Sequence, residues 1–141
     1  MDVRPAAPPT RDAIAARLRA TGINPTHQRI EIAQVLFERD QHLSADQILA
    51  RVNARQVEAS KATVYNTLKL FLERALIREL IVDPNKVFYD PNVEPHHHIY
   101  NVATGEIFDV PAADVHVHGL PPMPAGTVAD GIDIVVRARP A

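Results

Sequence analysis

The stretch from Ser60 to Phe71 constrains the fold more than any other part of the chain, because it predicts an amphipathic helix with a defined start. Ser60 is a favourable N-cap, and apolar residues follow at helical spacing at Val64, Leu68, Phe71 and Leu72. This spacing gathers the apolar side chains on one face, which packs inward. The other face carries Lys61, Tyr65, Asn66 and Lys69.

Two earlier segments carry similar helix signals. One apolar pattern begins at Thr26 and another begins after the N-cap Ser44. Downstream, residues 77–82 and 87–90 are rich in β-forming residues and flank a turn at 83–86. Three helices followed by a two-stranded hairpin is the arrangement of a winged helix-turn-helix, in which the third of these helices enters the major groove of DNA.

The polar face of the helix from residue 60 to residue 74 has side chains that suit DNA. Hydroxyl and amide groups can reach base edges, and cationic groups can bind phosphates. We expect base contacts from Thr63, Tyr65 and Asn66. We expect phosphate contacts from Lys61, Lys69 and Arg29, with Arg19 as a weaker candidate. For this segment alone, the alternative is a solvated helix with no ligand.

Five motifs follow one another along the chain. They are Thr26-x-x-Arg29, His42-Leu43-Ser44-Ala45, Ala62-Thr63-Val64-Tyr65-Asn66-Thr67-Leu68, Val87-Phe88-Tyr89 and His96-His97-His98. Their order and approximate spacing resemble the ferric uptake regulator family over nearly the whole chain after residue 10. Within this family, the chain most resembles the iron response regulator branch, whose members respond to haem. This similarity rests on the lack of Cys and on residues 96–101, 105–110 and 132–137.

The resemblance implies a homodimeric transcription regulator of iron and haem genes, a repressor or an activator and no enzyme. It implies an α+β fold and binding to double-stranded DNA at an AT-rich inverted repeat. We expect a disordered N-terminus at residues 1–10, a winged-helix DNA-binding domain at 11–90 and a hinge at 91–95, which holds two prolines. A small α/β or mostly β dimerisation and sensing domain then follows at 96–141, with strands near 96–102, 106–110 and 131–138.

The three consecutive histidines predict a ligand site. In a strand, His96 and His98 point to one face and His97 to the other, so two imidazoles can share a metal with a further ligand. The family resemblance implies a regulatory metal site made of His42, Asp83, His98 and Asp109. Such a site would join the DNA-binding half to the sensing half, so its occupancy would set the angle between the two recognition helices. Nitrogen and oxygen ligands suit Fe²⁺, Mn²⁺ or Zn²⁺.

Haem is the other expected effector. Similarity to the iron response regulator branch implies haem binding, or a second metal, at His96, His97 and His98, and neutral imidazole is a competent axial ligand. Tyr100 stands where metal-sensing members carry a further His. The chain has no cysteine, which excludes the Cys-ligated structural zinc of many family members. The alternatives are a surface strand for the histidines and a simple turn residue for Asp83.

Charge is distributed unevenly along the chain. Residues 11–80 hold 11 Lys or Arg and 8 Asp or Glu, whereas residues 81–141 hold 3 and 8. A basic first half suits phosphates, and an acidic second half suits cations. No apolar run has the length of a membrane span and the N-terminus lacks the core of a signal peptide, so we expect a cytoplasmic protein with no membrane partner.

Two other functions are compatible with parts of this pattern. One is a peroxide-sensing repressor of the same family, in which bound Fe²⁺ oxidises a liganding His. The other is a small β-barrel metalloenzyme built on His96-x-His98. The enzyme needs a suitable carboxylate, for which Glu106 is awkwardly spaced, and leaves the polar helix unexplained.

Overall fold

The computed structural model describes residues 7–55 and 58–141 and divides into two compact units, Met1–Val93 and Glu94–Ala141. The predicted disorder of residues 1–6 lies outside the described residues. Residues 7–10 have no regular structure and lead into the first helix. Within the described ranges, no helix combines the length and the apolar character needed to cross a bilayer.

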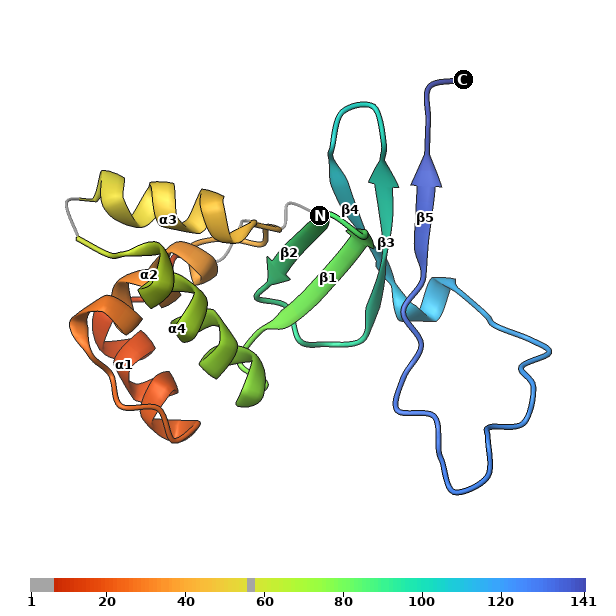
Figure 1. The fold of residues 1–141 in the computed structure, drawn as a ribbon, viewed down its shortest axis with the longest axis horizontal. Coiled ribbons are helices and arrows are strands. Elements are labelled where there is room, and N and C mark those ends of the chain that lie inside the picture. The colour runs from red at the N-terminus through yellow and green to blue at the C-terminus, as the bar shows by residue number, and fades with distance from the viewer. Residues whose placement is uncertain (1–6, 56–57) are drawn as a thin grey trace. The chain divides into compact units, whose positions relative to one another are not determined.

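The first unit contains the helices, which are α1 (Arg11–Ala20), α2 (His27–Phe37), α3 (Ala45–Ala54) and α4 (Lys61–Glu73) (Figure 1). The residue before each helix caps it, because its side-chain hydroxyl accepts a backbone N–H of the first turn. These N-caps are Thr10, Thr26, Ser44 and Ser60 in turn. The last three helices are those predicted from sequence. Helix α1 was not predicted, because its buried residues Ile14, Ala15 and Leu18 make only a short apolar pattern.

These helices share one apolar core. Its fully buried side chains include Leu18, Ile32, Ile48, Leu68 and Phe71, with at least one from each helix. The core stabilises the unit because each such side chain contributes about 1.5–3 kcal/mol when it leaves water.

A buried carboxylate adds an ionic link between three of the helices. Glu31 on α2 is only 6% exposed and lies 2.6 Å from Arg11 Nη1 on α1 and 3.0 Å from Arg55 Nε, which follows α3. Two cationic partners offset the cost of burying its charge. The pairs therefore fix α1 and the end of α3 against α2.

A two-stranded wing follows α4. Strands β1 (Arg78–Asp83) and β2 (Lys86–Asp90) pair antiparallel, as predicted. A bridge between Leu43 and Tyr89 ties the segment before α3 to β2, through N–H···O distances of 3.2 and 2.7 Å. The first unit is thus a winged helix-turn-helix, and its predicted recognition helix is α4.

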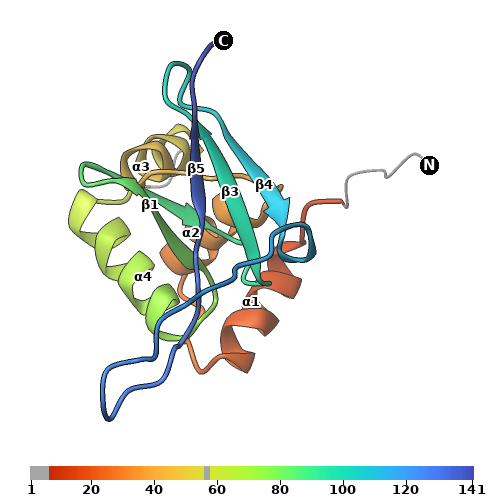
Figure 2. The same ribbon diagram turned by 90° about the vertical axis from the view of Figure 1, so that its right-hand side faces the viewer.

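The second unit is mostly β. It contains β3 (His96–Asn101), β4 (Ile107–Pro111), the 3₁₀ turn η1 (Ala112–Asp114) and β5 (Val135–Ala138). The central strand β3 pairs antiparallel with β4 and parallel with β5 (Figure 2). A long segment, residues 115–134, leaves the sheet and returns to β5 without forming a helix or strand (Figure 1).

The Pro-rich part of this segment forms no helix, as the sequence predicted. The predicted start of the last strand was wrong, however. Residues 131–134 are outside β5, which begins at Val135. The ladder with β3 runs over residues 135–138, and Ile134 accepts the His98 N–H without being part of the strand.

Phe71→Ala tests the core of the first unit. Phe71 is completely buried, so the substitution should lower the free energy of unfolding by about 3–5 kcal/mol, measured by urea denaturation. Tyr65→Ala is the matched control, because Tyr65 lies on the same helix and is 44% exposed. The control should change the free energy by no more than about 0.5 kcal/mol. Equal losses in the two variants would contradict this account of the core.

Candidate functional site

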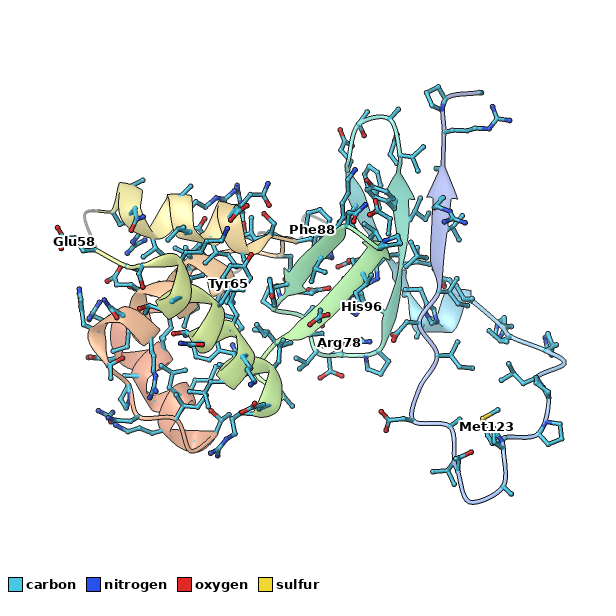
Figure 3. All side chains as sticks on the ribbon, in the orientation of Figure 1. Glu58, Tyr65, Arg78, Phe88, His96 and Met123 are labelled. Carbon is cyan, nitrogen blue, oxygen red and sulfur yellow. The ribbon has the colours of Figure 1, made fainter. Side chains whose placement is uncertain are left out.

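Helix α4 presents a polar face opposite its buried face. Val64, Leu68 and Phe71 are completely buried, whereas Tyr65 is 44% exposed. Lys61, Asn66 and Lys69 are also exposed. Figure 3 marks Tyr65 on this helix, among the side chains of the first unit. The helix therefore displays a phenol, an amide and two ammonium groups, the groups expected to contact bases and phosphates.

Contacts at its N-terminal end hold α4 in place. Gln28 on α2 donates from Nε2 to the carbonyl of Glu58, at 2.8 Å, just before the helix. The hydroxyls of Ser60 and Thr63 lie 2.9 Å apart, and Ser60 also accepts the N–H of Thr63. Thr63 is therefore engaged in the cap as well as lying near the predicted base-reading face.

Of the residues predicted to bind phosphates, Lys61 and Arg29 also make contacts within the first unit. The Nζ atom of Lys61 lies 3.8 Å from Asp46 Oδ1 and 5.8 Å from the ring centre of Tyr65. Arg29 donates from Nη1 to the carbonyl of Asn24, at 3.0 Å, so it also stabilises the turn before α2. Arg19 is exposed on α1.

Within the first unit, His42 lies against a carboxylate that the sequence analysis missed. His42 Nε2 is 3.1 Å from Asp90 Oδ2, and the Asp90 side chain is 3% exposed. The pairing follows from the Leu43–Tyr89 bridge. Because the two segments run antiparallel at this bridge, residue 42 lies beside residue 90. The sequence feature that could have pointed to Asp90 as a partner of His42 was its position at the end of a predicted strand, next to Pro91.

The end of β2 contains two further features, a hydrogen bond of Asp90 and a perturbed Tyr89 phenol. Asp90 Oδ1 accepts the N–H of Asn92 at 2.9 Å, which shapes the turn after β2. Burial raises the pKa of the Tyr89 phenol, and the charges of Glu79 and Tyr65 raise it further. The phenol is therefore neutral at physiological pH.

Asp83, the other predicted ligand of the first unit, lies in the wing turn. Its Oδ1 atom accepts the N–H of Asn85 at 2.8 Å, and its Oδ2 atom is 3.9 Å from Lys86 Nζ. These contacts are those of a turn-forming residue, which was the alternative considered for it. Its role as a ligand stays a prediction.

In the second unit, β3 and β4 bring together two imidazoles and a carboxylate. His98 lies directly opposite Asp109 in the ladder, and His96 is on the same face two residues earlier. The Nε2 atoms of His98 and His96 are 3.4 and 3.7 Å from Asp109 Oδ1. The two rings lie edge to face with their centres 4.5 Å apart, and His96 Nδ1 is 2.6 Å from the carbonyl of Glu94.

The donor set of this cluster fits a divalent metal ion. The ligand atoms of His96, His98 and Asp109 lie within 4.8 Å of one another. If the carbonyl of Glu94 accepts the proton of His96 Nδ1, then the unprotonated Nε2 is the atom of that ring that can bind a metal, an arrangement common for metal-binding His. Two imidazoles and a carboxylate make a nitrogen and oxygen donor set that suits Fe²⁺, Mn²⁺ or Zn²⁺.

His97 takes a different position. Its side chain points to the other face of β3, and its Nδ1 atom accepts the N–H of Ile134 at 3.1 Å. The structure therefore separates His97 from the pair formed by His96 and His98. Its predicted role in binding haem or a second metal stays a prediction.

The comparison with known proteins identifies the family. The model of the ferric uptake regulator family matches residues 20–119. The chain belongs to the ferric uptake regulator family. Members of this family are transcription regulators, and not enzymes, that bind DNA and form dimers. The iron response regulator branch stays a prediction.

Curated members of the family include peroxide-responsive repressors. The repressor PerR of Staphylococcus epidermidis is 32% identical over 94 residues, which are 67% of this chain and 63% of that protein. PerR of Staphylococcus aureus is 33% identical over 94 residues, 67% of this chain and 64% of the relative. The chain thus spans less than two thirds of the length of these relatives.

Solved structures show the same fold at low sequence identity. The ferric uptake regulator of Pseudomonas aeruginosa with manganese has a TM-score of 0.66 at 22% identity, covering 89% of this chain and 96% of that chain. The regulator of Vibrio cholerae has a TM-score of 0.69 at 18% identity, covering 89% and 98%. The peroxide stress regulator of Campylobacter jejuni has a TM-score of 0.62 at 19% identity, covering 92% and 95%.

His98→Ala tests the metal centre of the second unit. Removing a ligand should weaken Mn²⁺ or Zn²⁺ binding by more than the roughly 10- to 100-fold loss typical of an outer-shell partner, measured by isothermal titration calorimetry. His118→Ala is the control, because His118 is exposed in the long segment before β5. An equal effect of the two substitutions would remove His98 from the site. The same titration on His42→Ala, Asp83→Ala and Asp90→Ala tests the predicted and the newly found candidates of the first unit.

Proposed function

We propose that this chain is a homodimeric, metal-responsive transcription regulator that controls genes of iron homeostasis. The observation that carries the proposal is the cluster of His96, His98 and Asp109, in a chain that also has a winged helix with a polar recognition face. The winged helix supplies a means of reading DNA, and the cluster supplies a means of sensing a cation. Binding to chromosomal DNA places such a regulator in the cytoplasm.

On the DNA side, α4 enters the major groove of an AT-rich inverted repeat. Thr63, Tyr65 and Asn66 contact base edges, where hydroxyl and amide groups discriminate between base pairs. The phosphate contacts come from Lys61, Lys69, Arg29 and Arg19. Exposure of Tyr65 and of both lysines on α4 supports this assignment, because these groups can reach a ligand without rearrangement of the core.

A homodimer matches the two-fold symmetry of such an operator. An apolar row crosses the sheet of the second unit, since Ile99 is aligned with Phe108 on β4 and with Val136 on β5. Phe108 and Val136 are 50% and 52% exposed. Burying this row against a second copy would contribute to association, and in this cysteine-free chain no Cys-ligated structural zinc can add to it.

The effector is a divalent metal, with Fe²⁺, Mn²⁺ and Zn²⁺ as candidates. His96, His98 and Asp109 would hold it, and the bound ion would supply positive charge that keeps these three side chains in one arrangement. Solved relatives are described with manganese and with iron, and one as a zinc-bound manganese uptake regulator. His42 and Asp83 remain proposed ligands from the first unit, and Asp90 joins them as a candidate.

Haem is the alternative effector that the iron response regulator branch would use. The proposed ligands are then His96, His97 and His98. The carboxylate of Asp109 beside the two imidazoles of His96 and His98 favours a divalent ion over haem, because such an ion takes nitrogen and oxygen ligands together. The metal-responsive and haem-responsive functions predict different effects of Mn²⁺ and haem on DNA binding.

Fluorescence anisotropy of an AT-rich inverted-repeat duplex tests the function at fixed salt. The protein is compared in chelator, with Mn²⁺ and loaded with haem. Binding that requires Mn²⁺ and is insensitive to haem is expected for the metal-responsive regulator. Binding in chelator that haem abolishes would replace it by the iron response regulator function, and binding in none of the three conditions would remove the DNA assignment.

Tyr65→Ala is the specificity control for the same assay. Loss of a base contact should weaken binding to the operator by about 1–3 kcal/mol, with little change on a random duplex. Its folded state is checked by the unfolding measurement described for the core. An equal loss on both duplexes would mean that Tyr65 does not read bases.

Peroxide sensing is a second candidate function. The curated relatives are peroxide-responsive repressors, and the ligands available here are imidazole and carboxylate groups with no thiol. In this case a liganding His would be oxidised by peroxide: one peroxide oxygen would enter a ring C–H bond and the other would leave as water, and bound Fe²⁺ would supply the activation of peroxide. Mass spectrometry after peroxide treatment of the Fe²⁺ form should then find 16 Da on His42 or His98, about the mass of one oxygen. No addition on either residue, with the Mn²⁺ form as the unreactive control, would exclude peroxide sensing.

A further inference from the structure

The strand β5 is held to β3 at the residue just before it begins. The carbonyl of Ile134 accepts the backbone N–H of His98 at 3.0 Å. The N–H of Ile134 donates to Nδ1 of His97 at 3.1 Å. Both backbone groups of Ile134 are therefore bound by two consecutive residues of β3, one through its side chain and one through its main chain.

We propose that His97 is a positioning residue that clasps β5 onto β3 and is not a ligand for metal or haem. A ring nitrogen that accepts a hydrogen bond carries no proton, so the proton of the neutral ring is on Nε2. Ligation through Nε2 would move that proton to Nδ1, where it would face the N–H of Ile134. Clasping and ligation therefore exclude each other.

The hydrogen bond from the Ile134 N–H to His97 Nδ1, which we call the clasp, holds a short strand in register. β5 has only four residues, and it follows a segment of about twenty residues without helix or strand. Closing a segment of this length costs conformational entropy that a short strand must offset. A slip by one residue would also exchange the two faces of β5 and would turn Val136 away from the apolar row it forms with Ile99 and Phe108. A bond from a side chain to Ile134 fixes the register at the point of entry.

The clasp also supports the strand that carries the proposed metal ligands. His97 lies between His96 and His98, and the N–H of His98 is bound to the same Ile134. Loss of the clasp should loosen the backbone at His98, which weakens a pre-arranged site without removing a donor atom. This second consequence rests on the proposed metal site, whereas the clasp itself does not.

Three variants of the full chain test the proposal. In His97→Asn, the side-chain Oδ1 atom can take the place of Nδ1 as the acceptor, whereas His97→Ala has no acceptor. His118→Ala is the control, since it also removes one imidazole from the second unit. Two quantities are measured for each: the hydrogen-exchange rate of the Ile134 amide by NMR, and the affinity for Mn²⁺ by calorimetry together with haem titration by absorbance.

The Ile134 amide of His97→Ala should exchange about fivefold faster, whereas His97→Asn and His118→Ala should stay within about twofold of the unmodified chain. Mn²⁺ affinity should fall less than about tenfold in His97→Ala and recover in His97→Asn. Unchanged exchange in His97→Ala, or equally fast exchange in both His97 variants, would overturn the clasp. Loss of Mn²⁺ or haem binding in both His97 variants would instead make His97 a ligand.

Failure of the proposed function has a different signature. If the chain binds neither metal nor DNA, the Ile134 exchange rates still separate His97→Ala from His97→Asn. The exchange measurement therefore decides the clasp alone, and the titrations decide its link to the metal site.

Discussion

The second unit depends on β3 being hydrogen-bonded along both of its edges. This double pairing fixes the direction of every side chain on the strand, because alternate residues of a strand point to opposite faces. It places His98 opposite Asp109 and keeps His96 on the same face. The cluster is therefore produced by ladder register, and a slip of one residue between β3 and β4 would dismantle it.

The first unit obtains its functional geometry in another way. Its apolar core and the Arg11–Glu31–Arg55 ion pairs hold the helices, so that α4 can keep its polar side chains outside. The Leu43–Tyr89 bridge then extends this order to the wing. One main-chain contact thus decides which carboxylate His42 meets.

Local features of this fold could be predicted from sequence, and long-range ones could not. The N-caps Ser44 and Ser60 and the apolar pattern that begins at Thr26 marked three helices correctly, because these signals depend on residues close together in sequence. The pairing of His98 with Asp109 was within reach once two adjacent strands were assumed. Asp90 was missed, since its partner is 48 positions away in sequence and is reached only through a bridge outside the named strands.

Because of the hydrogen bonds at Ile134, the structure of the sheet does not depend on the length of the segment before it. Because β3 itself fixes where β5 begins, residues 115–134 do not set the register of the strand that follows. Doubling the length of such a segment costs only about 0.6 kcal/mol in closure entropy. Insertions and deletions should therefore accumulate there during evolution more readily than anywhere else in the second unit, and the segment is a natural place to graft a foreign peptide.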